Sequence, residues 1–86
     1  MYQLLVETSA EKDLENLSRE LFNVIIKRIL SLKENPHPLG TRKILGSKND
    51  WRIRVGTYRI IYEIDDKTRT VKIFRVKHRK NAYRYQ

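Results

Sequence analysis

Residues 50–65, which read DWRIRVGTYRIIYEID, hold the side chains most able to do chemistry, three closely spaced arginines. Alternating apolar and polar residues on both sides of Gly56-Thr57 predict a β-hairpin with a two-residue turn. Because successive side chains of a strand point to opposite faces, one face is apolar and the other is basic. The predicted core face consists of Trp51, Ile53, Val55, Tyr58, Ile60, Tyr62 and Ile64. The opposite face carries Arg52, Arg54, Arg59 and Glu63, with Ile61 among them.

The basic face of this hairpin indicates an anionic ligand. A turn at Gly56-Thr57 sets Arg54 directly opposite Arg59, and Cβ atoms of opposed residues lie about 5 Å apart. Like charges in that position destabilise a sheet, so we expect a group outside the fold to make use of them. Guanidinium groups have a fixed charge and a forked donor geometry, which suits phosphate.

The charge of the chain is unevenly distributed. The formal net charge is +9, but residues 1–34 hold five Lys or Arg against six Asp or Glu, whereas residues 35–86 hold fourteen against four. This split predicts one basic working face, for which phosphate backbones are the natural partner. A basic surface kept only for solubility is the alternative. A membrane-surface patch is disfavoured, because the basic residues fall on predicted strands and not on an amphipathic helix.

The length and composition exclude several classes of protein. Eighty-six residues form a single domain, 1–86, and a chain this short buries only roughly 60–65% of its unfolded surface. Without cysteine there is no disulfide framework. No apolar run approaches the ~20 residues of a membrane span, and charged residues interrupt any secretory signal, so we expect a cytoplasmic protein. Two histidines and scattered carboxylates lack metal-ligand spacing, and no glycine-rich nucleotide loop occurs, so neither metal nor cofactor is predicted.

The first half of the chain predicts a strand and two helices. Residues 2–6 are apolar and aromatic and predict a short strand. Thr8 and Glu11 have the spacing of a capping box, so Thr8 or Ser9 is expected to cap a helix. A leucine and isoleucine stripe continues to Leu32, and Ser18 is placed to cap a second helix, which favours a helical hairpin. The hairpin ends near 35–38, which reads NPHP.

The second half predicts the rest of a sheet. Ile44-Leu45 are expected either to form a short strand or to pin the basic loop 39–49 to the core. After the arginine hairpin and a turn at 65–68, residues 70–76 predict a last strand, with Val71 and Ile73 on one side and Phe74 and Val76 on the other. Apolar residues on both faces indicate an interior strand. The fold class is therefore α+β: an N-terminal strand, a helical hairpin, and a three-stranded antiparallel meander in one small sheet with the helices packed on one face.

The last ten residues, KHRKNAYRYQ, interleave basic and aromatic side chains. This composition suits RNA, because guanidinium groups bind phosphates while rings stack on bases. A frayed basic terminus is the alternative. Together with the basic loop, the tail supplies the residues expected to bind RNA, namely Lys43, Lys48, Lys77, His78, Lys80 and Arg84.

Two segments, WRIRVGTYRIIY at 51–62 and VKHRKNAYR at 76–84, together resemble the RelE toxins of the RelE/ParE superfamily of toxin–antitoxin systems. The order of predicted elements is also similar, so the resemblance covers essentially the whole chain. It implies a type II toxin that cleaves mRNA in the ribosomal A site and inhibits translation. It also implies a cognate antitoxin, with the ribosome and mRNA as targets and operator DNA contacted only through the antitoxin.

The resemblance also implies a set of catalytic residues. Arg52 and Arg54 fall where the best-studied members carry lysines. Arg59 matches an arginine of the next strand, and Arg79 matches one at the end of the last strand. Tyr83 falls near a tyrosine that stacks on or activates the substrate nucleotide.

Cleavage of RNA by its own 2′-OH needs proton removal, stabilisation of extra negative charge, and protonation of the leaving group. Arginines suit the second task but not the first and third, because they stay protonated. Tyr83, His78 and Glu63 are the local alternatives for proton transfer. Strand alternation puts His78 on the face opposite Arg79, and Glu63 is expected to pair with a neighbouring arginine. If the ribosome contributes by aligning the mRNA, free RNA should be cut poorly.

Two other functions are also compatible with the sequence. ParE-like relatives share the architecture but poison DNA gyrase, and they generally lack the basic, tyrosine-containing tail. A nucleic-acid-binding module without catalysis would also explain the basic face, because charge alone does not show that a bond is broken.

Overall fold

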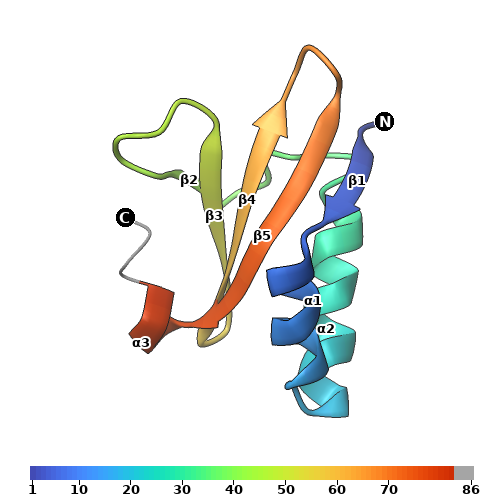
Figure 1. Cartoon of the computed structure of the whole chain (residues 1–86), viewed down its shortest axis with the longest axis vertical. Helices are drawn as coiled ribbons and strands as arrows, with labels where there is room; N and C mark the ends of the chain where they lie inside the picture. Colours follow the sequence, from blue (N-terminus) through green and yellow to red (C-terminus); the bar gives the residue numbers. More distant parts are fainter. Residues whose placement is uncertain (83–86) are drawn as a thin grey trace.

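The computed structural model describes residues 1–82 of the chain, and this region folds as a five-stranded sheet with helices (Figure 1). The elements in chain order are β1 (Gln3–Val6), α1 (Thr8–Glu15), α2 (Arg19–Ser31), β2 (Arg42–Lys43), β3 (Asp50–Val55), β4 (Tyr58–Asp65), β5 (Thr70–His78) and α3 (Arg79–Ala82). The strand order is β1-β5-β4-β3-β2, with β1 parallel to β5 and the other pairs antiparallel. The predicted α+β class, with an N-terminal strand, helical hairpin and meander, is confirmed.

The arginine hairpin has the predicted register. Val55 pairs with Tyr58, and Arg54 pairs with Arg59. The turn residue Gly56 has φ +60°, whereas Thr57 does not have a positive φ, which is the pattern of a type II′ turn. This turn matches the twist of the flanking strands and fixes which side chains share a face.

The helices begin differently from each other. In α2 the prediction is confirmed, because the Ser18 hydroxyl accepts a hydrogen bond from the Leu21 backbone N–H at 3.2 Å. In α1 the predicted cap is wrong: Thr8 is already helical, and Glu7 occupies the N-cap position without a side-chain cap. The reason is that the Glu7 N–H donates to the Ile73 carbonyl at 2.9 Å, so the chain passes from the sheet directly into the helix.

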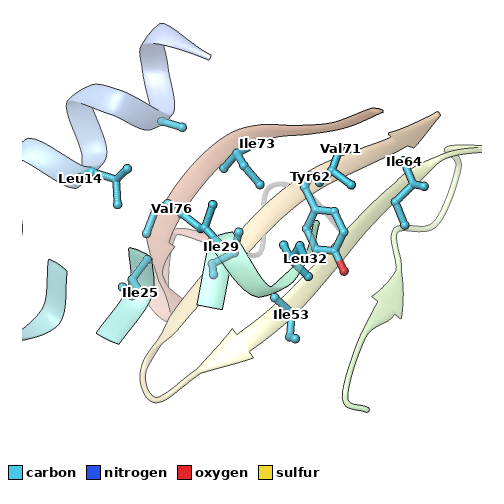
Figure 2. Packing of buried hydrophobic residues seen from close by; sticks show 12 residues of the cluster. Leu14, Ile25, Ile29, Leu32, Ile53, Tyr62, Ile64, Val71, Ile73 and Val76 are labelled. Carbon is cyan, nitrogen blue, oxygen red and sulfur yellow. The ribbon is translucent and has the colours of Figure 1, made fainter. Parts of the chain in front are cut away.

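The core lies between the helices and one face of the sheet (Figure 2). From α2, Ile25, Ile29 and Leu32 are fully buried against the strands. The predicted core face of the hairpin is confirmed: Ile53, Ile60, Tyr62 and Ile64 are buried, and Trp51, Val55 and Tyr58 pack partly buried against them. Within residues 1–82, no helix is long and apolar enough to cross a membrane.

A β-bulge in β5 changes the predicted faces of that strand. Ile61 pairs with Arg75 but the next residue, Tyr62, pairs with Ile73, so Phe74 has no partner in β4. The bulge reverses the alternation, and Val76 joins Val71 and Ile73 in the core. The prediction that Val76 shares a face with Phe74 is therefore wrong. The prediction that this strand is interior is confirmed, since β5 lies between β1 and β4.

The short strand β2 also differs from expectation. It consists of Arg42–Lys43 and pairs with β3, so the suggested strand at Ile44-Leu45 is wrong. Ile44 is instead buried and pins the loop, while Leu45 is 84% exposed. The Ile44 N–H still donates to the Asp50 carbonyl at 2.9 Å, which closes the end of the β2–β3 pairing.

Asp13 of α1 accepts hydrogen bonds from the part of β5 that lies beyond its pairing with β1. Its carboxylate accepts hydrogen bonds from the Val76 backbone N–H at 2.9 Å and from the Arg75 guanidinium at 2.9 and 3.1 Å. Partial burial alone would raise the pKa of Asp13, but the hydrogen bonds from Arg75 and Val76 outweigh it and hold the pKa below its ordinary value. The ionised carboxylate therefore stabilises the folded state.

We expect Asp13→Asn to lower the free energy of unfolding by about 2 kcal/mol near neutral pH, because it removes a charged acceptor of several hydrogen bonds. The folded pKa is depressed, so this stabilisation is present above the ordinary carboxyl value of about 4 and is lost as the pH falls through the folded pKa. Urea unfolding of both proteins across this pH range would measure it. Exposed Glu15 on the same helix gives the control, Glu15→Gln. A difference between wild type and Asp13→Asn that does not shrink in acid would contradict this account.

Candidate nucleic-acid interface

Five arginines from four elements line one cleft of about 460 Å³. Its lining residues are Arg42 of β2, Arg52 and Arg54 of β3, Arg59 of β4 and Arg79 of α3, with Gly40 and Ala82. We call this the arginine cleft. It brings together all four arginines that the sequence suggested for phosphate binding, and adds Arg42, which was not predicted as a site residue.

The register of the sheet explains how these arginines meet. Arg42 lies directly opposite Arg52, and Arg54 lies directly opposite Arg59. Directly opposed residues share a face, so these four side chains lie on the face turned away from the core. The fifth, Arg79, is held by its backbone N–H, which donates to the Thr57 carbonyl of the hairpin turn at 2.7 Å.

The cleft is electropositive. None of its lining residues within 1–82 is acidic, and two pairs of like charges face each other across strands. Such pairs destabilise a sheet when no counter-charge is present. The Arg59 guanidinium is oriented by the turn, because its Nη1 donates to the Tyr58 carbonyl at 3.0 Å and to the Gly56 carbonyl at 3.3 Å. The geometry is suited to binding phosphate groups through several forked donors.

Comparison with known proteins identifies the family. The family described as ParE toxin of type II toxin-antitoxin system, parDE, matches residues 4–83. Toxin RelG of Mycobacterium tuberculosis is 33% identical over 87 residues, which cover 96% of this chain and 97% of RelG. The chain belongs to the RelE/ParE superfamily and is a RelE-type toxin. It is thus a member of a type II toxin–antitoxin family.

Solved RelE structures have the same fold. The archaeal RelE–RelB complex of Pyrococcus horikoshii matches with a TM-score of 0.82 at 26% identity, covering 94% of this chain and 98% of that one. The antitoxin–toxin complex RelB–RelE of Methanococcus jannaschii matches with a TM-score of 0.75 at 31% identity, covering 95% and 98%. The RelE-like arrangement predicted from sequence is therefore confirmed.

The basic loop of this RelE-type toxin contributes to the cleft through a different residue than expected. Lys43 lies opposite Trp51 and so shares the core-side face, away from the arginine cleft. Lys48 is exposed in the loop before β3 and does not line the cleft. Arg42 and Lys43 are equivalent in a local reading of the sequence. Only the pairing of β2 with β3 determines which of them faces the arginines.

The end of β5 distributes its polar residues over both faces. Lys77 lies opposite Arg59 on the cleft side of the sheet, although it does not line the cleft. His78 lies opposite Tyr58, with the ring centroids 5.5 Å apart in an edge-to-face contact. The His78 Nδ1 accepts from the Lys80 backbone N–H at 3.3 Å, so this ring caps α3 and is turned away from the cleft. Lys80 is exposed on α3.

Glu63, Tyr83 and Arg84 are the remaining residues predicted from the sequence. Glu63 is opposed by Asp50 and Lys72, and within residues 1–82 it forms no ion pair with an arginine, contrary to the expectation. Tyr83 and Arg84 lie outside the described residues. In the region that the structure covers, no group of three or more His, Cys, Asp or Glu could hold a metal ion.

Proposed function

We propose that this RelE-type toxin is a ribosome-dependent endoribonuclease that cleaves mRNA in the A site and thereby inhibits translation. The observation that supports the proposal most strongly is the arginine cleft. Five guanidinium-bearing residues converge there, and none of the lining residues in the described part of the chain, 1–82, is acidic. This is an arrangement for stabilising a phosphate that gains negative charge.

In the proposed reaction, the 2′-oxygen of a nucleotide forms a bond to the adjacent phosphorus and the bond from phosphorus to the 5′-oxygen breaks. The phosphate carries additional negative charge in the transition state, and donors aimed at that charge lower the barrier. Arg52, Arg54 and Arg79 would bind the phosphate oxygens, while Arg59, oriented by the turn carbonyls, would hold its charge near the leaving oxygen.

The arginines of the cleft do not account for the proton transfers that the reaction needs. A proton must leave the 2′-OH and another must reach the 5′-oxygen, but arginine does neither. His78, the nearest histidine in the sequence, is occupied in capping α3 on the other face. We therefore propose that Tyr83 positions the nucleotide or relays a proton, and that the ribosome supplies alignment. The expected consequence is slow cleavage of free RNA.

A cognate antitoxin is proposed as the protein partner. Relatives from Pyrococcus horikoshii and Methanococcus jannaschii were solved as complexes of RelE with RelB. A cleft with five arginines would be masked by an acidic segment, since complementary charges speed and orient association. Contact with operator DNA would then occur only through the antitoxin.

The test is to add the purified toxin to programmed ribosomes and map the 5′ ends of the mRNA. We expect cuts at the A-site codon with wild type, about 100-fold slower cutting with Arg54→Ala, and unchanged cutting with the exposed control Lys48→Ala. Free mRNA should remain largely intact.

Two other outcomes would replace the proposal. The family match carries the name ParE, so DNA gyrase is the second candidate target. Gyrase-linked DNA breaks with intact mRNA would support that function. Salt-sensitive binding of nucleic acid with neither lesion would indicate a binding module without catalysis.

A further inference from the structure

The sheet face that carries the arginine cleft has a second hollow beside that cleft. Its volume is about 420 Å³, and Ile44, Asp50, Ile61, Phe74 and Arg75 are among the residues that line it. We call it the bulge pocket. Ile61 lies directly opposite Arg52 of the arginine cleft, and Asp50 precedes Arg52 by two residues on the same face of β3. The two hollows are therefore neighbours on one surface.

The bulge in β5 provides the aromatic wall of this pocket. Phe74 is the unpaired residue of the bulge, and it is half-buried but outside the core cluster. Bulges re-aim side chains and are common next to functional sites. Ile61 and Ile44 line the same pocket and are 2% and 9% exposed, so part of its lining is apolar. An aromatic ring together with apolar side chains, next to a cationic cleft, is suited to stacking on a nucleobase.

The linings of the two hollows differ in charge. Asp50 and Glu7 line the bulge pocket, with Glu7 3.9 Å from the Lys72 ammonium, whereas the lining of the arginine cleft within 1–82 has no acidic residue. Arg75 also lines the pocket, but its guanidinium binds the Asp13 carboxylate. Carboxylates disfavour a phosphate, yet they accept hydrogen bonds from the N–H groups of a base edge. The phosphate of a nucleotide thus fits the arginine cleft, and its base fits the bulge pocket.

We propose that the bulge pocket binds one nucleobase of single-stranded RNA, stacked on Phe74, with an N–H of the base edge donating to Asp50. Along β3, Asp50 and Arg52 are separated by about 7 Å, which is within the span of one nucleotide. The proposal rests on the proposed function for the identity of the RNA. It makes Phe74 and Asp50 determinants of base preference at the position next to the cleaved phosphate.

Binding can be measured without cleavage by using a short 2′-O-methyl RNA, which cannot undergo attack by a 2′-OH. Abasic residues are placed at each position in turn, and affinity is measured by fluorescence anisotropy. We expect wild type to lose about 10-fold in affinity when the base at one position is removed. Phe74→Leu, which keeps apolar bulk but lacks the ring, should bind intact RNA about 10-fold more weakly and be insensitive to that abasic position. Phe74→Tyr should behave as wild type.

The chain offers a matched control, because its other phenylalanine, Phe22, lies on α2 away from the pocket. Phe22→Ala should leave RNA affinity and the abasic response unchanged. Asp50→Asn should change the preference among the four bases at the sensitive position, since an amide both donates and accepts. Thermal unfolding of each variant identifies any loss that comes from misfolding, and Phe74→Tyr then decides whether the ring itself is required.

The possible outcomes test the bulge pocket and the proposed nuclease activity independently. Equal affinity of wild type and Phe74→Leu for every RNA would overturn the pocket, as would equal weakening for intact and abasic RNA. A Phe74→Leu defect confined to an acidic antitoxin peptide would assign the pocket to the protein partner and also overturn it. Base-dependent binding without cleavage on ribosomes would support the pocket and reject the nuclease. Ribosome-dependent cleavage whose KM and base preference are the same in wild type and Phe74→Leu would support the nuclease and reject the pocket.

Discussion

Arg42→Ala is expected to slow ribosome-dependent mRNA cleavage about 100-fold, whereas Lys43→Ala, one residue later, is expected to leave the rate unchanged. The two residues share a two-residue strand, yet their pairing with β3 puts Arg42 in the arginine cleft and Lys43 on the opposite face. Removing one donor aimed at a developing charge typically has an effect of this size. Single-turnover cleavage with saturating toxin measures the rate of the chemical step.

The comparison also separates charge from position. Each variant removes one positive charge, so a general loss of electrostatic attraction to RNA should affect both equally. Arg42→Ala also relieves repulsion with Arg52, so its free energy of unfolding should stay level or rise by up to about 1 kcal/mol. Equal cleavage by the two variants would show that Arg42 acts only through net charge. A large loss of stability in Arg42→Ala would show that the arginine pair supports the fold.

The arginine hairpin could be predicted from sequence because its determinants are local. Period-two alternation and the glycine at position 56 set the register, and the register then set which residues are opposed. The prediction of the apolar face of the hairpin was correct for the same reason. No other part of the chain has to be known to place Arg54 opposite Arg59.

Arg42 and Phe74 could not be placed in this way. The face of Arg42 depends on how β2 pairs with β3 across the loop 44–49, and one residue of slip would exchange Arg42 with Lys43. The face of Phe74 depends on a bulge, which inserts one residue without a distinctive sequence signal. Both are consequences of long-range pairing. They are also the positions where the site gains an extra cation and an aromatic wall.

The start of α1 shows that a local motif does not always predict a helix boundary. Thr8 and Glu11 have the spacing of a capping box, but the sheet determines the actual boundary through the Glu7–Ile73 hydrogen bond. A tertiary contact thus replaced a local motif. Ser18, which has no strand beside it in sequence, caps α2 as the local pattern indicates.

Tyr62 connects the core to the loop that leads into the cleft. Its side chain is fully buried, and its hydroxyl donates to the Pro36 carbonyl at 2.8 Å and lies 3.3 Å from the Thr41 hydroxyl. Thr41 is flanked by Gly40 and Arg42, which both line the arginine cleft. The ring therefore packs the core while the hydroxyl fixes the loop.

We expect Tyr62→Ala to lower the free energy of unfolding by about 3–5 kcal/mol, because it leaves a large cavity in a core this small. Tyr62→Phe keeps the ring and should lose only about 1–2 kcal/mol, from the unpaired Pro36 carbonyl. Urea unfolding of the three proteins measures both effects. If the two substitutions were equally destabilising, the hydroxyl and not the ring would dominate. If Tyr62→Phe were neutral, the loop would be held without its hydrogen bond, and Tyr62 would contribute to the arginine cleft through packing alone.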